Sequence, residues 1–189
     1  MPRQGVLVTS ARFTLGQTAE IPGPKKAFLI SKPEVVAAMI KRMKRTVFVI
    51  GSESLKLKNK DGDLVDIMMR ISNLSKSPIV ATGNMFGEFK KRNAKNVYSM
   101  SLMNLGERLR DQEWGGLDGK GPYDLAIFCG LPYYMEWLVL SGLKNFAPHL
   151  TTISLDNTYH PNATWSLGYL QEKDWMASLD KIASILEAS

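Results

Sequence analysis

Two apolar runs without polar alternation constrain the fold of this 189-residue chain more than any other feature. Residues 46–50 read TVFVI before Gly51, and residues 125–129 read LAIFC before Gly130. A strand with one solvated face alternates apolar and polar side chains, so these runs indicate strands that are buried on both faces. Such strands are typical of a parallel sheet covered by helices on each side.

Helical and strand patterns alternate along the rest of the chain. The spacing of Ser31 and Glu34 around Pro33 indicates a capping box that begins the first helix, which continues to Met43. We expect further helices at Leu64–Leu74, Met85–Arg92, Leu102–Gln112, Pro132–Phe146 and Glu172–Leu186, and further strands at Pro78–Thr82, Asn96–Ser101 and Thr151–Asp156. This alternation predicts an α/β fold, a Rossmann-like three-layer domain with a mostly parallel, doubly wound sheet of about five strands.

The first 32 residues show no clean period and contain two prolines spaced by a glycine, at residues 22–24. We interpret residues 1–32 as an extended arm, ordered by packing on the domain or on a partner. The length of the remainder predicts that residues 33–189 form a single Rossmann-like domain.

Composition limits the metal chemistry that the chain can carry. Cys129 is the only cysteine, and there are two histidines. These residues cannot form a four-thiolate iron–sulfur site or a Cys/His structural zinc site, so we expect no metal or iron–sulfur cluster of its own. The lack of a disulfide, of a secretory signal and of a membrane span leads us to expect a soluble, cytoplasmic protein.

The net charge of +6 is spread over three lysine- and arginine-rich runs, at residues 41–45, 56–60 and 90–95. No helix-turn-helix pattern or interleaved aromatic motif accompanies them, so we interpret them as solvated loop ends and helix tails and expect no nucleic-acid partner. An acidic protein partner would use the same charge equally well, and self-association stays open.

Ligands of open α/β sheets bind beyond the carboxyl ends of the strands, where several residues of this sequence are predicted to lie. Glycines there either let a ligand approach the backbone or simply turn the chain. No phosphate-loop motif decides between these two roles. The candidate residues for an FAD or nucleotide site are Gly51, Ser52, Gly83, Asn84, Gly130, Leu131, Pro132, Asp156 and His160.

No catalytic constellation is evident, so the chain is not expected to be an enzyme alone. Cys129 lies within an apolar strand, where a thiol is buried and inert. Asp156 and His160 could be read as a catalytic pair, but no nucleophile or second acid accompanies them. We favour a hydrogen-bonded turn that carries the chain across the carboxyl-end cleft, as a wall of a flavin site or as part of a partner surface.

An ordered set of segments carries a family resemblance: residues 21–27, 47–52, 123–128 with Gly130, 132–134, 143–146, 152–156 and 159–163. Together they resemble the ε subunit of the archaeal carbon monoxide dehydrogenase/acetyl-CoA decarbonylase-synthase complex. The first twenty residues contain no matching segment.

The resemblance implies a DHS-like NAD/FAD-binding domain, as in the centre of thiamine-diphosphate enzymes. It further implies an accessory subunit bound to a large, nickel- and iron–sulfur-bearing α subunit in an α2ε2 assembly, which interconverts CO and CO2 during acetyl-CoA synthesis or cleavage. Two roles for the smaller subunit stay open: it stabilises α, or it binds FAD and assists electron transfer.

Overall fold

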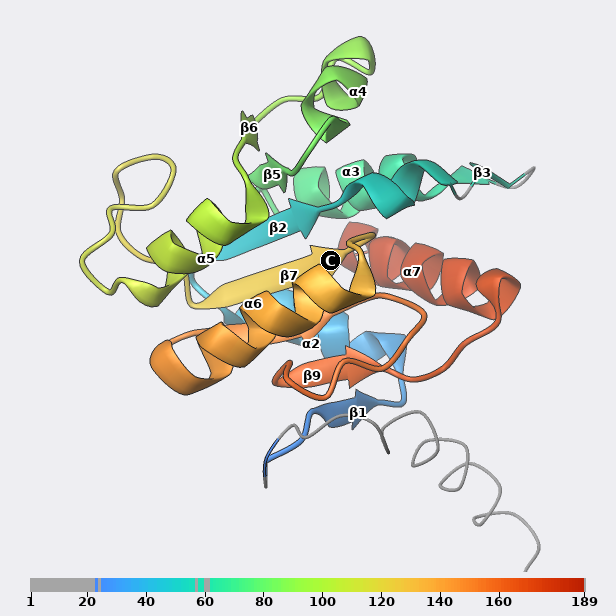
Figure 1. Cartoon of the computed structure of the whole chain (residues 1–189). Coiled ribbons are helices and arrows are strands. Elements are labelled where there is room, and N and C mark those ends of the chain that lie inside the picture. Colours follow the sequence, from blue (N-terminus) through green and yellow to red (C-terminus); the bar gives the residue numbers. More distant parts are fainter. Residues whose placement is uncertain (1–22, 24, 57, 60–61, 189) are drawn as a thin grey trace, which may run out of the picture.

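The computed structural model describes residue 23 and residues 25–56, 58–59 and 62–188. Within these residues, seven parallel strands form one sheet in the spatial order β1-β9-β8-β7-β2-β5-β6 (Figure 1). The strands are β1 (Phe28–Ile30), β2 (Thr46–Ile50), β5 (Ile79–Ala81), β6 (Val97–Ser99), β7 (Leu125–Cys129), β8 (Thr151–Ser154) and β9 (Trp165–Leu167). A separate antiparallel pair joins β3 (Lys58–Asn59) to β4 (Gly62–Asp63).

The two apolar runs form the paired central strands β2 and β7, and every residue of both strands is buried. Side chains of β2 alternate between two cores. Phe48 and Ile50 enter one core, whereas Val47 and Val49 enter the other. The absence of polar alternation thus reflects burial on both faces of the sheet.

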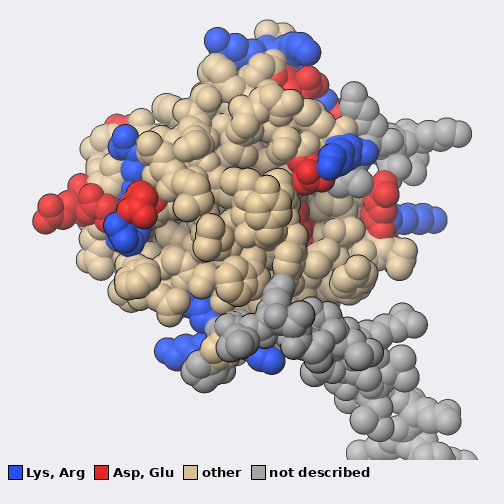
Figure 2. All heavy atoms as spheres, in the orientation of Figure 1, with Lys and Arg blue, Asp and Glu red and all other residues tan. Residues whose placement is uncertain are grey.

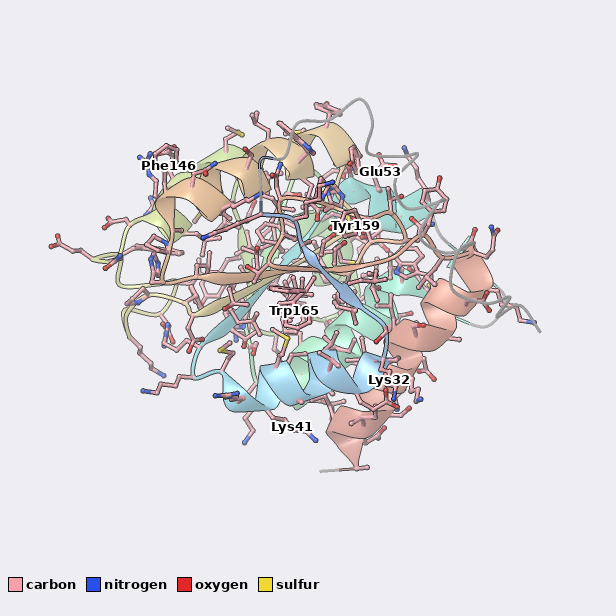
Figure 3. The ribbon with its side chains drawn as sticks, turned by 90° about the horizontal axis from the view of Figure 1, so that it is seen from below. Lys32, Lys41, Glu53, Phe146, Tyr159 and Trp165 are labelled. Atoms are coloured by element: carbon pink, nitrogen blue, oxygen red, sulfur yellow. The ribbon has the colours of Figure 1, made fainter. Side chains whose placement is uncertain are left out.

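Helices cover both faces of the sheet, which confirms the predicted α/β fold with a parallel sheet. The helices α2, α3 and α7 pack over one core, and α5 and α6 pack over the other. The helices are α2 (Pro33–Arg42), α3 (Leu64–Leu74), α4 (Met85–Lys91), α5 (Leu102–Arg110), α6 (Tyr133–Phe146) and α7 (Glu172–Glu187), with a short 3₁₀ helix η1 (Ser52–Lys56). In Figure 3, α2 extends from the labelled Lys32, its N-cap residue, to the labelled Lys41 in its last turn.

The start of α2 differs from the expected capping box. Lys32 is the N-cap residue and makes no side-chain cap, although Pro33 occupies the first turn as predicted. Proline fixes a helical φ angle and lacks the N–H that a cap would satisfy, so the helix begins without the Ser31 hydroxyl.

The sheet has two strands that the sequence did not predict. Phe28–Ile30, within the expected arm, forms the edge strand β1 and pairs in parallel with β9. The rings of Phe28 and Trp165 lie 5.1 Å apart across this pair. The sheet therefore includes part of the segment interpreted as an arm, which packs on the domain through β1. Residues 1–22 and 24 lie outside the described residues.

Two of the three basic runs begin at helix ends, in agreement with their interpretation as helix tails; residues 57 and 60 of the third run lie outside the described residues. Lys41 and Arg42 end α2, and Lys90 and Lys91 end α4. Figure 2 shows lysines and arginines dispersed around the rim of the visible face rather than gathered into one field. Among the described residues, no helix is both long enough and apolar enough to cross a membrane.

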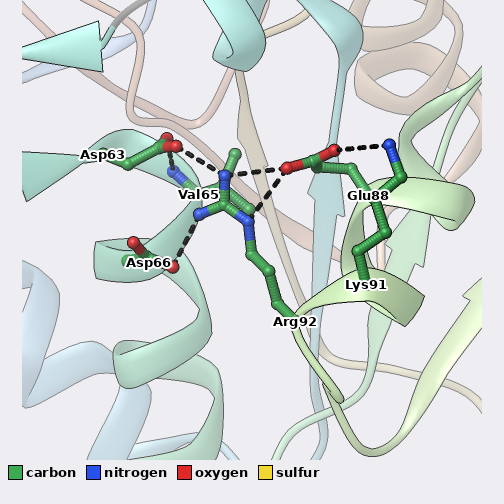
Figure 4. A network of polar contacts seen from close by, with 6 residues as sticks. All are labelled: Asp63, Val65, Asp66, Glu88, Lys91 and Arg92. Atoms are coloured by element: carbon green, nitrogen blue, oxygen red, sulfur yellow. Dashed lines mark hydrogen bonds and ion pairs between the residues drawn. The ribbon is translucent and has the colours of Figure 1, made fainter.

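Arg92 belongs to a network of ion pairs that fixes α4 to the start of α3 (Figure 4). Its guanidinium lies 2.5 Å from Asp63, 2.6 Å from Asp66 and 3.0 Å from Glu88. Partial burial lowers the pKa of Arg92, but the hydrogen bonds that its guanidinium donates to the three carboxylates outweigh burial and raise the pKa overall. One residue of the basic run 90–95 is thus a structural cation.

The turns that follow β2 and β7 cross in direct contact at two glycines. The Gly51 N–H donates to the Cys129 carbonyl at 3.0 Å, and the Glu53 N–H donates to the Gly130 carbonyl at 2.9 Å. A Cβ atom on Gly51 would lie 2.7 Å from the Cα of Leu131. Gly130 has a φ of +69° and faces Ser54 closely. These glycines therefore provide room for a neighbouring backbone segment.

This crossing predicts a severe effect of a single methyl group. Gly51→Ala should destabilise the fold by about 3 kcal/mol, because backbone atoms on both sides cannot move away. A loss of this size lowers the melting temperature of a chain of this length by roughly 6–12 °C.

Gly87 is the matched control, because it is exposed on α4 and a Cβ there would meet no atom within 4 Å. Gly87→Ala should be neutral or stabilising by up to about 1 kcal/mol, since alanine favours helix. Thermal unfolding followed by circular dichroism checks both variants. Equal melting temperatures for the two variants would contradict the close crossing.

Candidate functional site

A cavity of about 430 Å³ opens at the carboxyl ends of the central strands. Gly130, Leu131 and Pro132, in the turn after β7, form one side of it. The loop after β8 contributes Asp156 and His160. Further walls come from η1, from Tyr133 at the start of α6 and from Trp175 of α7. The segments that follow β2, β7 and β8 therefore shape the same cavity.

The structure places the nine predicted site residues in three groups. Gly130, Leu131, Pro132, Asp156 and His160 line the cavity. Gly51 and Ser52 begin the neighbouring turn and η1 but do not line it. Gly83 and Asn84 are exposed in the turn before α4, beyond the end of β5, and also do not line it. The carboxyl edge thus unites five of the predicted residues, and their role as a binding site stays a prediction.

Asp156 ties the loop after β8 to the turn after β7. Its carboxylate accepts a hydrogen bond of 2.6 Å from the Gly130 N–H. The indole N–H of Trp175 donates to the carbonyl of the preceding residue, Leu155, at 2.6 Å. Both contacts are buried, so the position of Asp156 is fixed from two sides of the sheet.

Glu136, in α6, is the functional candidate that sequence reasoning missed. Its side chain is completely buried, and neither carboxyl oxygen has a hydrogen-bond partner of ordinary geometry. Its Oε2 atom lies 3.7 Å from Nε2 of His160. The signal was its spacing: Glu136 shares one helical face with Val139, Leu140 and Leu143, all of which are buried.

Burial dominates the electrostatics of this group. It raises the pKa of the Glu136 carboxyl well above its ordinary value, and the nearby Asp156 charge raises it further. Burial also raises the pKa of Asp156, against the opposing effects of Glu136 and the Gly130 N–H. The pKa of His160 falls to about 4 because its charged form is desolvated. The group thus comprises two carboxyls and a neutral imidazole.

The loop 155–164 is held by hydrogen bonds along its length, as the preferred interpretation of Asp156 and His160 required. The His160 N–H donates to Oγ of Ser166 at 3.0 Å, and the Tyr159 hydroxyl donates to the Ala27 carbonyl at 2.7 Å. The His160 ring stacks on Tyr133 with centroids 4.3 Å apart. These contacts fix the histidine as a wall of the cavity.

Cys129 is completely buried in β7, as expected for an inert thiol. Burial raises its pKa well above the ordinary value, and the Asp156 and Glu136 charges raise it further. The thiolate that nucleophilic chemistry requires is therefore disfavoured at neutral pH.

The buried Glu136 carboxyl predicts a pH-dependent stability. Because its folded pKa is raised, the folded state binds the proton more tightly, and stability is lost as pH rises from about 4.5 through the folded pKa. Glu136→Gln removes this loss. Between pH 5 and pH 8, the melting temperature of the EDTA-treated variant should rise by roughly 2–4 °C relative to that of the wild type. This is the shift expected from a change of about 1 kcal/mol in the free energy of unfolding.

Glu53→Gln, which removes a carboxylate at the cavity rim, is the control for the loss of one acidic side chain. If the melting temperatures of the wild type and Glu136→Gln change equally with pH across this range, Glu136 is ionised in the folded protein at little cost in stability.

The sequence of this chain is similar to those of a known protein family. The family model for "CO dehydrogenase beta subunit/acetyl-CoA synthase epsilon subunit" matches residues 13–183. The match begins earlier than the segments on which the sequence resemblance rested.

Three archaeal relatives cover nearly the same length, and each is named as subunit epsilon of an acetyl-CoA decarbonylase/synthase complex. The protein of Methanothermobacter thermautotrophicus is 30% identical over 94% of this chain and 98% of its own. That of Methanothrix soehngenii is 35% identical over 90% of both chains. Subunit epsilon 1 of Archaeoglobus fulgidus is 38% identical over 84% of this chain and 81% of its own. On these matches, the chain belongs to the family of the CO dehydrogenase β subunit and the acetyl-CoA synthase ε subunit.

Proposed function

We propose that this protein is the accessory ε subunit of a carbon monoxide dehydrogenase component, binding and stabilising a large nickel–iron–sulfur α subunit in an α2ε2 assembly. The observation that carries the proposal is the family match over nearly the whole chain. The single cysteine supports it independently, because a chain with one thiol cannot hold iron–sulfur clusters. The redox metals of CO/CO2 interconversion must then reside on the partner.

The outer surface of α6 supports docking of this partner. Tyr134, Leu138 and Phe146 of α6 are 73%, 53% and 64% exposed, and Met103 of the adjacent α5 is 49% exposed. Figure 2 shows few charges in the middle of the face on which α6 lies in Figure 1. Tyr134 lies in the first turn of α6 and Phe146, labelled in Figure 3, is its last residue, so exposed apolar side chains occur along the length of the helix. Exposed apolar patches on soluble proteins are typical of protein interfaces.

Co-expression with the large nickel–iron–sulfur subunit of the same complex tests both parts of the proposal. The tagged wild-type chain should retain that subunit, whereas Leu138→Arg should weaken retention at least tenfold, because a charge would be buried in the interface. Leu74→Arg is the matched control on α3, where Leu74 is 37% exposed.

Failure of the wild-type chain to retain the large subunit would contradict the proposed function. Retention that is equal for the wild type and Leu138→Arg would leave the function in place and exclude α6 as the contact surface.

A second proposed activity is FAD or nucleotide binding in the carboxyl-edge cavity, in support of electron transfer. We propose a Rossmann-like assignment, because β6-β5-β2-β7-β8-β9 follows the spatial order 3-2-1-4-5-6 of dinucleotide-binding folds when these strands are numbered along the chain. The cavity lies where that order reverses, between β2 and β7, and its volume is within the range of roughly 300–1,000 Å³ for ligand pockets.

The lining fits a phosphate-bearing ring compound in part. Lys56 offers a cation at the rim, and Tyr133 and Trp175 offer aromatic surface. The glycines offer less backbone to a ligand than expected, because Gly51 and Gly130 pack against neighbouring backbone. Any phosphate would therefore depend on Lys56 more than on a glycine-rich cradle.

Titration with FAD, followed by flavin fluorescence, tests this second activity. Lys56→Glu should weaken binding at least tenfold, because it opposes the phosphate charge, whereas Lys90→Glu on the distant α4 should not. No fluorescence change at high micromolar FAD, for the free chain and for the complex, would rule out the flavin role.

A further inference from the structure

Two elements bring metal-ligating side chains together beneath the cavity. Glu136 comes from α6, whereas Asp156 and His160 come from the loop after β8. One ligand atom from each residue lies within 4.8 Å of the other two, and all three side chains are buried. The helix and the loop meet only in the folded chain, so the group arises from the fold and not from a local sequence motif.

Several polar atoms of this group are buried without a hydrogen bond of ordinary geometry. They are both carboxyl oxygens of Glu136, Nδ1 of His160 and Oγ of the adjacent Ser154. Glu136, Ser154 and His160 are at most 1% exposed, and the Glu136 carboxyl is close enough to Asp156 and Ser154 to interact with both. Buried polar groups are normally paired, because an unpaired one gives up its hydration and gains nothing in return. A ligand bound among these side chains would supply the missing partners.

The charges of the group point to a cation. Within the described part of the chain, His160 is the only basic side chain within 4 Å of the Glu136 carboxyl. Lys56, at the cavity rim, is paired with Glu53 at 2.6 Å. When both carboxyls are deprotonated, the group carries two negative charges beside a neutral imidazole, and one divalent ion neutralises both.

We propose that Glu136, Asp156 and His160 bind one divalent first-row transition-metal ion. Carboxylate oxygen and imidazole nitrogen are ligands that suit Zn²⁺, Mn²⁺ and Fe²⁺, and they need no further cysteine. This proposal departs from the expectation that the chain holds no metal of its own, because that expectation rested on thiolate sites and this site needs no thiolate.

The spacing is compatible with a common ion after a small closure. Two ligands at about 2.1 Å from one ion lie roughly 3.4 Å apart at a tetrahedral angle and at most roughly 4.2 Å apart. The 3.7 Å between Glu136 and His160 falls in this range. The outer limit of 4.8 Å for the group exceeds the linear separation by roughly 0.6 Å and the tetrahedral separation by roughly 1.4 Å, so the side chains would have to move together on binding.

Three protein ligands leave coordination positions open. Asp156 and His160 also line the cavity, whereas Glu136 lies behind them in α6. The free positions therefore face the cavity, where they would hold water or an oxygen atom of a bound ligand. Such an ion would join α6 to the loop 155–164 and give the cavity a positive centre.

The test uses the full chain, stripped with EDTA and dialysed against Zn²⁺ or Mn²⁺ at ten micromolar, with metal content measured by elemental analysis. Wild-type protein should retain one equivalent of at least one of these ions and melt at a higher temperature when it is loaded. Glu136→Gln and His160→Gln should each weaken binding at least tenfold. Circular dichroism confirms that each variant is folded before it is counted.

His149→Gln and Glu53→Gln are the controls, because they remove the other histidine and a carboxylate of the cavity rim without touching the three ligands. Both controls should bind like the wild type. Less than 0.1 equivalent in the wild type, or equal losses in the His149 and His160 variants, would overturn the proposal.

Discussion

The structure depends on how closely the turns after β2 and β7 approach one another. Gly51 and Gly130 leave no space for a side chain between these turns, and each turn donates or accepts a backbone hydrogen bond across the gap. Asp156 joins the same point through its bond to the Gly130 N–H. Three strand ends are thus tied into one rigid edge, which positions the cavity and the start of α6.

The sequence predicted which strands end at this edge, but not the contacts that the two glycines make there. Runs of apolar residues identified β2 and β7 as doubly buried strands, because burial on both faces removes alternation. A glycine at a strand end, however, gives the same sequence pattern whether a ligand or another backbone segment packs against it. Only the crossing showed that Gly51 and Gly130 face protein.

Other features escaped prediction for different physical reasons. β1 and β9 lie outside the alternation of strands and helices that the sequence predicted, and they exist through pairing between residues far apart in sequence. Glu136 was overlooked because a glutamate in an amphipathic helix usually faces water. Its position on the buried face of α6 acquires meaning only when the fold brings Asp156 and His160 to it.

The two sides of α6 thus differ in character. The inner side carries the buried Glu136 toward the carboxyl edge, whereas the outer side exposes Tyr134, Leu138 and Phe146. For a family named after subunits of a CO dehydrogenase/acetyl-CoA synthase complex, a helix with one side facing a polar site and the other side free for a partner is a consistent arrangement. A partner bound to α6 would contact the element that holds Glu136.

The most direct test of this account is a high-resolution structure of the complex purified from the organism that makes this chain. The account predicts that α6 is covered by the large subunit, with Tyr134 and Leu138 buried in the contact. A complex in which α6 remains exposed to solvent and the chain binds through another surface would contradict it.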